Sequence, residues 1–515
     1  MSEEIKEIKN PFKEIVQPFI DLIHAPRALW GINLPYLLEG MCYFGILGYL
    51  AIYFSDIVFK GVEHADVYSH YMVMVLTAGI TIAMFFLGFV ADKYGVRRAL
   101  LSAFLVMLAG RFLIAGGPAL GFQMGLWGGV HIATLAGIIL VVVGYGMYQP
   151  AAYAGVRQVT TEKTAPMAFA MLYALMNLGG YLPTFAFIVR DKDYLGWGIN
   201  GAFWVYTAFT VVALLCTFFI LSRRTMNDAI EVAKRETVAA AKEEKKADSL
   251  VVADKTVPTH LWVFLAVIAG LFALIPFPWL KFGLWSLTAC ALVVVFLLPS
   301  VQRRKVLLWL ANHPLSDAKF FFFIFALIPV QTLFAYNWLI LPQYVSRCYT
   351  GWIGEKFEIA SNFNPILVFV FVPIITALTY KRKVYNMMIL GTFIMATPAF
   401  FLTMGTNFWT LFGYLVIMTI GESMWQPRFL QFAAQIAPEG RTGVYMGVAQ
   451  LPWFLTKMLV PALYSGRMLE AFCPAEGIKN PQMMWMWFGL IAIASPILLI
   501  IAKPWAGKDF KAHAD

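Results

Sequence analysis

The sequence predicts an all-α membrane protein built from two related halves, and three observations support this prediction. Hydrophobic residues make up 60% of the 515 positions and charged residues only 13%, whereas soluble domains carry about 25% charged residues. The heptapeptide Gly144–Pro150 (GYGMYQP) recurs 277 positions later as Gly421–Pro427 (GESMWQP). Lysine and arginine also concentrate in alternate loops between apolar segments, as they do when every second loop faces the cytoplasm.

Apolar segments define the predicted membrane spans, because a helix needs about 20 apolar residues to cross a bilayer. Segment 260–275 is the shortest of them. The fourteen predicted spans are 32–54, 71–91, 98–116, 128–154, 167–189, 198–221, 260–275, 281–299, 318–341, 363–380, 384–404, 408–436, 442–467 and 483–502.

The segments between these spans divide the chain into blocks. A polar linker rich in Ala, Glu and Lys follows the sixth span, and two extra spans precede the last six. The expected blocks are a cytoplasmic N-terminus with an interfacial helix at 1–31, a six-helix bundle at 32–221, the cytoplasmic linker at 222–259, two extra spans at 260–299, a cytoplasmic connection at 300–317, a second six-helix bundle at 318–502 and a cytoplasmic tail at 503–515.

The basic residues orient this arrangement. With both termini in the cytoplasm, 28 of the 39 Lys and Arg residues lie on the cytoplasmic side, 8 lie outside, and Arg111, Arg428 and Lys457 lie within spans. Positive charge is retained on the cytoplasmic side of membrane proteins. The net charge of +10 is therefore an orientation signal, and it does not indicate a nucleic-acid partner.

Two six-helix halves related by a parallel repeat are the architecture of major facilitator transporters. The loop between the second and third spans resembles the signature of that superfamily, G-x-x-x-D-[RK]-x-G-x-[RK]-[RK]. Its matching residues are Gly88, Asp92, Gly95, Arg97 and Arg98. The resemblance implies a cytoplasmic gating loop, in which Asp92 caps a helix or pairs with one of the two arginines.

More specifically, the chain resembles the proton-dependent oligopeptide transporter family. The resemblance covers most of the chain, and the motifs occur in the family's order. They are Glu39–Gly45 on the first helix, Gly144–Pro150 on the fourth, Met176–Gly179 on the fifth, Asn364–Pro365 with Pro373 on the eighth, Gly421–Pro427 on the tenth and Trp453–Leu455 on the eleventh.

Several positions depart from the family pattern. Tyr36 replaces the first Glu of the first-helix motif, Gly40 replaces its Arg, and Gln149 replaces the fourth-helix Lys. Val330, beside Gln331, stands where the family has a seventh-helix acid. Lys457 occupies a position that is usually small.

Two charged residues on consecutive spans, Glu422 and Lys457, lie near the predicted midplane, roughly 21 and 22 Å from the cytoplasmic ends of their helices. An ionisable residue at that depth usually faces a cavity or a partner and marks a transport path. We expect the two to form an ion pair. The pair is either a switch that substrate or a proton opens, or a permanent structural contact.

Glu39 is the second candidate for carrying a proton, because burial of an unpaired carboxyl favours its protonated form. Glu39 and Gln149 lie at the same predicted depth, which puts them within reach of a hydrogen bond. The alternative is a structural Glu39, held by Gln149 or paired with Arg111.

The resemblance implies a substrate site lined by residues from both halves. The expected substrate-binding residues are Glu422, Lys457, Trp453, Asn177, Tyr43, Gln149, Gln331 and Asn364, with Glu39 and Glu422 in proton coupling.

Motifs for catalysis or cofactor binding are missing from the sequence. It contains neither a G-x-x-x-x-G-K-[ST] motif nor an H-E-x-x-H motif, so we expect no enzyme activity, no metal and no cofactor. Cys348 and Cys473 are the two cysteines outside the predicted spans, both on the outer side. We hypothesise a disulfide between these two, and the alternative is two free thiols in the outer loops.

The sequence thus predicts a secondary active transporter of the bacterial inner membrane that moves a small polar organic solute together with a proton. Peptides or peptide-like molecules are favoured by the resemblance. The expected partners are the solute, the coupling ion and the lipid bilayer, and the protein is expected to be a monomer. Two alternatives stay open: an organic anion or zwitterion exchanger, and a sensor or scaffold that has the fold without transport.

Overall fold

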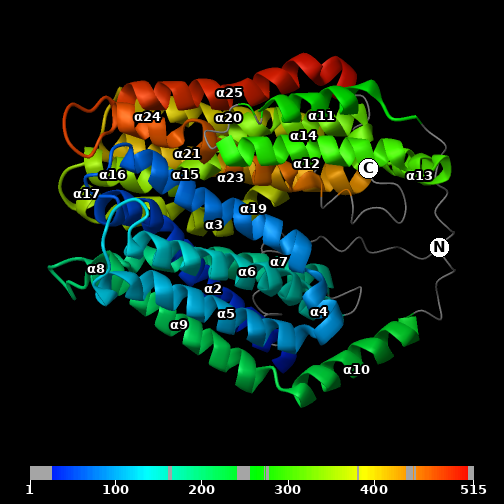
Figure 1. Ribbon diagram of the computed structural model, residues 1–515, viewed down its shortest axis with the longest axis horizontal. Coiled ribbons are helices and arrows are strands. Elements are labelled where there is room, and N and C mark those ends of the chain that lie inside the picture. Colours follow the sequence, from blue (N-terminus) through cyan, green and yellow to red (C-terminus); the bar gives the residue numbers. More distant parts are fainter. Residues whose placement is uncertain are drawn as a thin grey trace, which may run out of the picture.

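The computed structural model describes residues 26–160, 165–240, 256–271, 273, 278–379, 382–436, 445 and 448–507, and every element assigned within them is helical. The long helices fall into two groups, with the N-terminal half below and the C-terminal half above in Figure 1. The expected N-terminal block at 1–31, with its interfacial helix, lies almost entirely outside the described residues, which begin at Pro26.

The N-terminal half follows the six predicted spans. The first extends further than the predicted 32–54, because its α-helix begins at Arg27 and continues as one π-helical turn to Val58. The elements are α2 (Arg27–Ile52), η1 (Tyr53–Val58), α3 (Ala65–Leu87), α4 (Phe89–Tyr94), α5 (Val96–Gly116), η2 (Gly117–Leu120), α6 (Gly129–Gln158), α7 (Ala165–Tyr181), η3 (Leu182–Phe185), α8 (Phe187–Arg190) and α9 (Gly198–Ile220).

The C-terminal half has more broken helices. Pro329 and Pro342 stand in the first turns of α15 and α16, where a missing N–H interrupts the preceding helix. The elements are α14 (Ala318–Ala326), α15 (Ile328–Leu339), α16 (Leu341–Cys348), α17 (Trp352–Glu355), α18 (Phe357–Ser361), α19 (Phe363–Thr379), α20 (Val384–Ala396), η6 (Thr397–Met404), α21 (Phe408–Ile436), α23 (Leu451–Leu463), α24 (Ser465–Phe472) and α25 (Pro481–Ala506).

The repeated glycines have the same packing role in both halves. A Cβ atom at Gly144 of α6 would lie 2.4 Å from the Met107 side chain of α5, and one at Gly421 of α21 would lie 2.3 Å from the Met395 backbone nitrogen of α20. Small residues let membrane helices approach this closely. The repeat therefore sets a close helix contact in each half, and only the second copy adds a carboxylate beside it.

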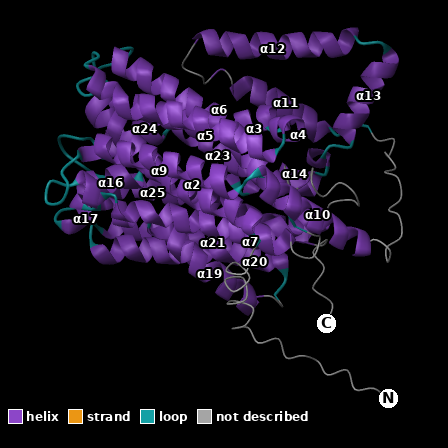
Figure 2. Cartoon of the chain, turned by 90° about the horizontal axis from the view of Figure 1, so that it is seen from below, coloured by secondary structure: helices purple, strands orange, loops and turns teal. Residues whose placement is uncertain are grey.

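The linker and the extra spans lie outside the two bundles. They comprise α10 (Arg223–Ala240), α11 (Thr259–Leu271), α12 (Pro278–Leu297), α13 (Ser300–Ala311) and η5 (Pro314–Ser316). Figure 2 shows α12 standing at the edge of the molecule, joined to the rest through α13.

Ten helices among the described residues are long and apolar enough to cross a membrane. The extra segments appear as shorter apolar helices, at Thr259–Gly270 and Lys281–Leu297. The all-helical membrane architecture is confirmed, and the count of fourteen spans stays a prediction.

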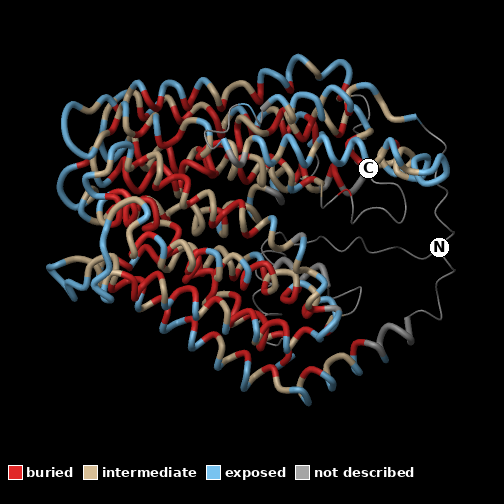
Figure 3. Tube along the Cα trace, viewed as in Figure 1, coloured by how far each residue is buried: buried red, intermediate tan, exposed pale blue. Residues whose placement is uncertain are grey.

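The two halves meet where α3 packs against α23 and α24, α7 against α19, α2 against α15 and α16, and η3 against α18. The ribbons of the two halves are close at the end that carries α16, α17 and α24, and diverge toward the end that carries α4 and α13 (Figure 1). Buried residues concentrate between the helices, and exposed residues follow the outer faces (Figure 3). We call the end that carries α16, α17 and α24 the closed end.

Candidate functional site

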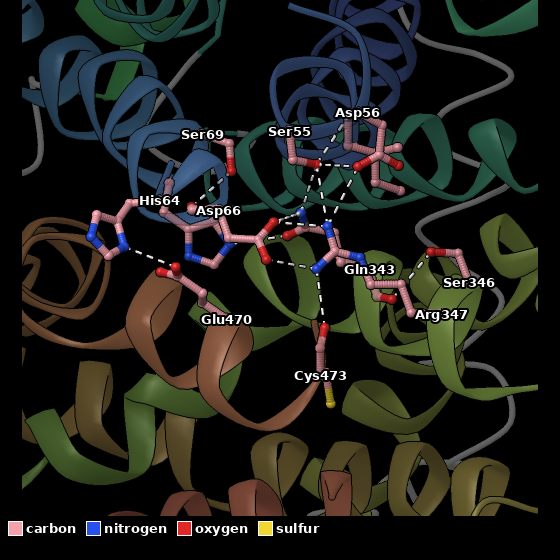
Figure 4. Close-up of polar contacts among 12 residues, drawn as sticks. Ser55, Asp56, His64, Asp66, Ser69, Gln343, Ser346, Arg347, Glu470 and Cys473 are labelled. Atoms are coloured by element: carbon pink, nitrogen blue, oxygen red, sulfur yellow. Dashed lines mark hydrogen bonds and ion pairs between the residues drawn. The ribbon is translucent and has the colours of Figure 1, made fainter. Parts of the chain in front are cut away.

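A buried ion pair joins the halves at the closed end. The two terminal guanidinium nitrogens of Arg347, on α16, donate to the two oxygens of the Asp66 carboxylate of α3, each at 2.7 Å. The two side chains are 7% and 8% exposed. Arg347 also donates to the carbonyl oxygen of Cys473 at 3.1 Å and lies 3.4 Å from Asp56 (Figure 4). Such a bidentate pair is strong and geometrically specific, so it holds α3 against the C-terminal half.

His70 extends this contact further into the protein. Its Nε2 atom lies 3.0 Å from the side-chain oxygen of Gln343, and its Nδ1 atom lies 2.7 Å from the Ser465 hydroxyl. The Gln343 amide in turn donates to Ser55 at 3.1 Å and to Asp66 at 3.2 Å. We call Asp66, His70, Gln343, Arg347 and Ser465 the closing cluster.

A second polar contact crosses the halves at the same end. The Arg190 side chain of α8 donates to Glu358 of α18 at 2.6 Å, and the Tyr49 hydroxyl of α2 donates to the same carboxylate at 2.5 Å. The Arg190 guanidinium also lies over the Phe357 ring. Further hydrogen bonds between described residues of the two halves lie at this same end, among them His64 to Glu470 at 2.8 Å and Lys356 to Tyr194 at 3.2 Å.

Glu422 is the buried carboxylate of the C-terminal half. It follows Gly421, whose contact with α20 fixes the position of α21 at this level. Asn364 of α19 donates to the Glu422 carboxylate at 2.8 Å and to the Thr419 hydroxyl at 2.9 Å. The structure thus brings together two residues that the sequence assigns to the substrate site. An amide donor leaves the negative charge of Glu422 uncompensated.

Lys457 does not reach Glu422. Although both residues lie in the described part of the chain, no ion pair joins them. The Lys457 ammonium lies 4.9 Å from the centre of the Trp453 ring on its own helix. A cation over an indole face is an attractive contact. Trp453 packs in turn edge-on against Phe334 and Trp338 of α15. The expected Glu422–Lys457 pair is therefore wrong for this conformation, because each side chain has another partner.

The N-terminal half presents neutral groups toward Glu422. Tyr173 of α7 is close enough to Glu422 for electrostatic interaction, yet 53% of its surface is exposed. Asn177 lies one turn along and donates to the Tyr173 carbonyl at 3.0 Å. Because α7 packs against α19, Tyr173 lies where the halves meet, on the exposed side of the buried Glu422.

The remaining predicted site residues are spread between the two halves. The Tyr43 ring lies 5.1 Å from that of Tyr145, and Gln149 donates to the Tyr36 hydroxyl at 3.4 Å. In the C-terminal half, Gln331 is buried on α15 and its side-chain oxygen has no hydrogen-bond partner in the described structure.

Glu39 is held in an ion pair inside the N-terminal half. Arg111 of α5 donates to one Glu39 oxygen at 2.8 Å and also to the other, and it donates to the Thr210 hydroxyl of α9 at 2.5 Å. Glu39 and Arg111 are 0% and 1% exposed. A bond from Glu39 to Gln149 does not form, because Arg111 occupies both carboxylate oxygens. The alternative of a pair with Arg111 is the one that forms.

The loop signature connects two helix ends. Gly95 takes a φ of 83° between α4 and α5. Arg97 donates to the Leu221 carbonyl at 2.7 Å and to the Phe218 carbonyl at 3.3 Å, so a cation meets the negative end of α9. The side-chain contacts expected for Asp92 lie outside the described residues.

Comparison with known proteins agrees with this architecture. The family model described as Major Facilitator Superfamily matches residues 63–461. The chain belongs to the major facilitator superfamily.

Other proteins of this superfamily resemble the chain over almost its whole length. It is 23% identical to dipeptide and tripeptide permease A of Proteus mirabilis (strain HI4320), covering 96% of this chain and 97% of the permease. The corresponding permease of Klebsiella pneumoniae (strain 342) is 22% identical, with 94% and 93% covered. A crystal structure of peptide transporter POT in complex with sulfate shares the fold, with a TM-score of 0.63, 16% identity and 95% and 96% covered. A POT family transporter in complex with 5-aminolevulinic acid gives a TM-score of 0.64, 15% identity and 94% and 97% covered.

The packing of this major facilitator protein explains one departure from the oligopeptide transporter pattern. A Cβ atom at Gly40, where that family has an Arg, would lie 2.9 Å from the Met176 carbonyl oxygen of α7. A longer side chain would require α2 and α7 to separate. The buried arginine beside Glu39 comes instead from α5, as Arg111.

Sequence reasoning missed the closing cluster and the Arg190–Glu358 contact. Charged residues at the ends of predicted spans are common, and Arg347 and Asp66 are 281 positions apart. The available signal was opposite charge at the outer ends of spans in different halves, and it does not specify which residues pair. The hypothesised disulfide is not formed, since Cys348 and Cys473 are free thiols with their sulfur atoms 3.6 Å apart.

Proposed function

We propose that this protein is a proton-coupled symporter of peptides or peptide-like zwitterions in a bacterial inner membrane, with both termini in the cytoplasm. In this orientation the closed end faces outward, and the structure corresponds to an inward-facing state. Support comes from the charge distribution of the loops and from the relatives, which are dipeptide and tripeptide permeases. The protein acts in the membrane as a monomer.

The observation that carries this proposal is the separation of Glu422 from Lys457. One acid and one base lie in the C-terminal half, and neither neutralises the other. A small zwitterion supplies the missing partners, because its ammonium can bind Glu422 and its carboxylate can bind Lys457. Each contact would be a charge-assisted hydrogen bond. Trp453, Asn364, Asn177, Tyr43, Gln149 and Gln331 would then surround the rest of the solute.

We assign the exchangeable proton to Glu422. A buried carboxylate without a cation favours its protonated form, so the proton and the substrate ammonium compete for one site. Glu39 can accept a proton only in a state in which Arg111 has moved away from it. For this reason Glu39 is the second candidate for the proton site. The loop with Gly88, Asp92, Gly95, Arg97 and Arg98 is assigned to movement at the cytoplasmic end.

Alternating access follows from where the halves are held together. The closing cluster and the Arg190–Glu358 contact join the halves at one end only. To open that end, these contacts must break and the two halves must come together at the other end. Rocking of two bundles about a midplane site is the usual mechanism of this architecture.

Uptake into proteoliposomes tests the proposal and separates it from the two alternatives. A panel of di- and tripeptides is presented with and without an inward pH gradient. A symporter accumulates at least one of them only with the gradient. An exchanger shows gradient-independent uptake that a solute inside the vesicle stimulates, and a sensor or scaffold shows neither, so either result would overturn the proposal.

A further inference from the structure

A basic pocket lies between α20 and α25, away from Glu422 and the closing cluster. It has a volume of about 550 Å³. Residues from the start of α20 and the last turns of α25 line it, including Lys383, Tyr385, Asn386, Ile500, Lys503 and Pro504. Ligand pockets commonly measure about 300–1,000 Å³, so the space suits a small polar group.

The charge of the pocket is uncompensated. Lys383 and Lys503 approach it from two different helices, and in the described part of the chain neither has a carboxylate within 4.0 Å. Lys383 directly precedes α20, whose first turn contains no acidic residue and whose N-terminus has no side-chain cap. The Tyr385 hydroxyl is already used, because it donates to the Leu499 carbonyl at 2.6 Å. The two charged side chains of the pocket are thus both cationic, and the Asn386 amide adds a hydrogen-bond donor, so the lining suits an anion.

The surface beside the pocket is apolar and exposed. Ile501 of α25 is 70% exposed and Leu390 of α20 is 46% exposed. Trp505, one turn from Ile501, is 46% exposed and is a residue type that favours the membrane interface. The anion site therefore borders directly on the faces that acyl chains cover in a membrane.

The geometry points to a binding site for the phosphate headgroup of an anionic phospholipid, with Lys383 and Lys503 as its two cationic contacts and the acyl chains along α20 and α25. Basic pockets between membrane helices bind such headgroups on the cytoplasmic side. Only the leaflet depends on the proposed orientation, which puts the lipid in the cytoplasmic leaflet. Binding itself does not depend on transport.

Native mass spectrometry of the full-length protein, titrated with phosphatidylglycerol, tests this site. The Lys383→Gln/Lys503→Gln variant is compared with Arg223→Gln/Lys305→Gln, which removes two exposed charges from α10 and α13. A surface lysine contributes about 5-fold to the affinity for anionic lipid, so we expect the pocket variant to lose about 25-fold and the control variant to stay near the parent. The charge-preserving Lys383→Arg/Lys503→Arg variant, which excludes a folding defect, should retain the lipid.

Three results would overturn the proposal. The first is an equal loss of affinity for phosphatidylglycerol in the pocket and control variants. The second is that the parent retains phosphatidylcholine as well as it retains phosphatidylglycerol. The third is displacement of phosphatidylglycerol by equimolar inorganic phosphate. The last result would show a free-anion site in place of a lipid site. The orientation of the protein is measured separately, by labelling a cysteine introduced at Lys503 from either side of the membrane. A wrong orientation can then be distinguished from a wrong lipid site.

Discussion

Arg347 binds both carboxylate oxygens of Asp66 at 2.7 Å, across the boundary between the two halves. Removing one member of a buried pair leaves the other without compensation and costs about 3–5 kcal/mol. We therefore expect Arg347→Ala to shift the population from the closed to the open arrangement at this end. Pulsed electron spin resonance between labels at Gln123 and Ile478, exposed residues of opposite halves, should report a longer distance. Lys192→Ala, a change of an exposed lysine outside the cluster, should leave the distance unchanged, and an unchanged distance in Arg347→Ala would refute the role of the pair.

Gly466 tests the same closure without changing charge. A Cβ atom there would lie 2.7 Å from the Val67 Cα atom and 2.9 Å from the Asp66 carbonyl oxygen. Because backbone atoms cannot rotate away, we expect Gly466→Ala to force α24 from α3 and to lengthen the same label distance. Gly48→Ala is the matched control, because a Cβ atom there has nothing within 4 Å. If both alanine variants behave alike, the close contact is not what holds this end.

Glu39 distinguishes a structural ion pair from a proton carrier. If the pair with Arg111 is structural, Glu39→Gln should lower stability by about 3–5 kcal/mol, and Glu39→Gln/Arg111→Met should recover much of it. Thermal unfolding in detergent measures both. If Glu39 carries the proton, the single variant should instead unfold like the parent, lose pH-driven uptake and retain counterflow.

The Cys348 and Cys473 thiols provide a pH-dependent prediction. The neighbouring Cys473 lowers the pKa of Cys348, and Lys479 and Arg347 act in the same direction against the effect of burial. A lowered pKa means that the thiolate forms at a lower pH than in an ordinary cysteine, and the thiolate is the reactive form. We expect a mild oxidant to form a disulfide between the two thiols. The rate of this reaction should rise with pH and reach its plateau at a lower pH than for a cysteine with an ordinary pKa. Cys348→Ser is the control. Two titratable thiols remaining at these positions after oxidation would contradict the prediction.

The sequence predicted the helical architecture because apolar length and basic loops are local signals. It also predicted that Glu422 and Asn364 belong to one site, since both stand in motifs with a recognisable order. It could not predict the partner of Lys457, because the same ammonium can reach a carboxylate on the next span or an indole on its own helix. The Glu39–Arg111 pair was one of two alternatives. Choosing between them required the position of α5, which places Arg111 against both oxygens of Glu39.

The central claim is that Glu422 and Lys457 hold the two charged ends of one solute. The most direct measurement is the affinity for a dipeptide, its N-acetylated form and its C-terminal amide, taken from thermal shifts of the parent, Glu422→Gln and Lys457→Met. We expect the parent to prefer the free dipeptide over both derivatives by about 10- to 100-fold, because hydrogen bonds to charged groups contribute about 1.5–3 kcal/mol. Glu422→Gln should lose only the preference over the N-acetylated form, and Lys457→Met only the preference over the amide. If both variants keep both preferences, neither residue holds the solute and the account is wrong.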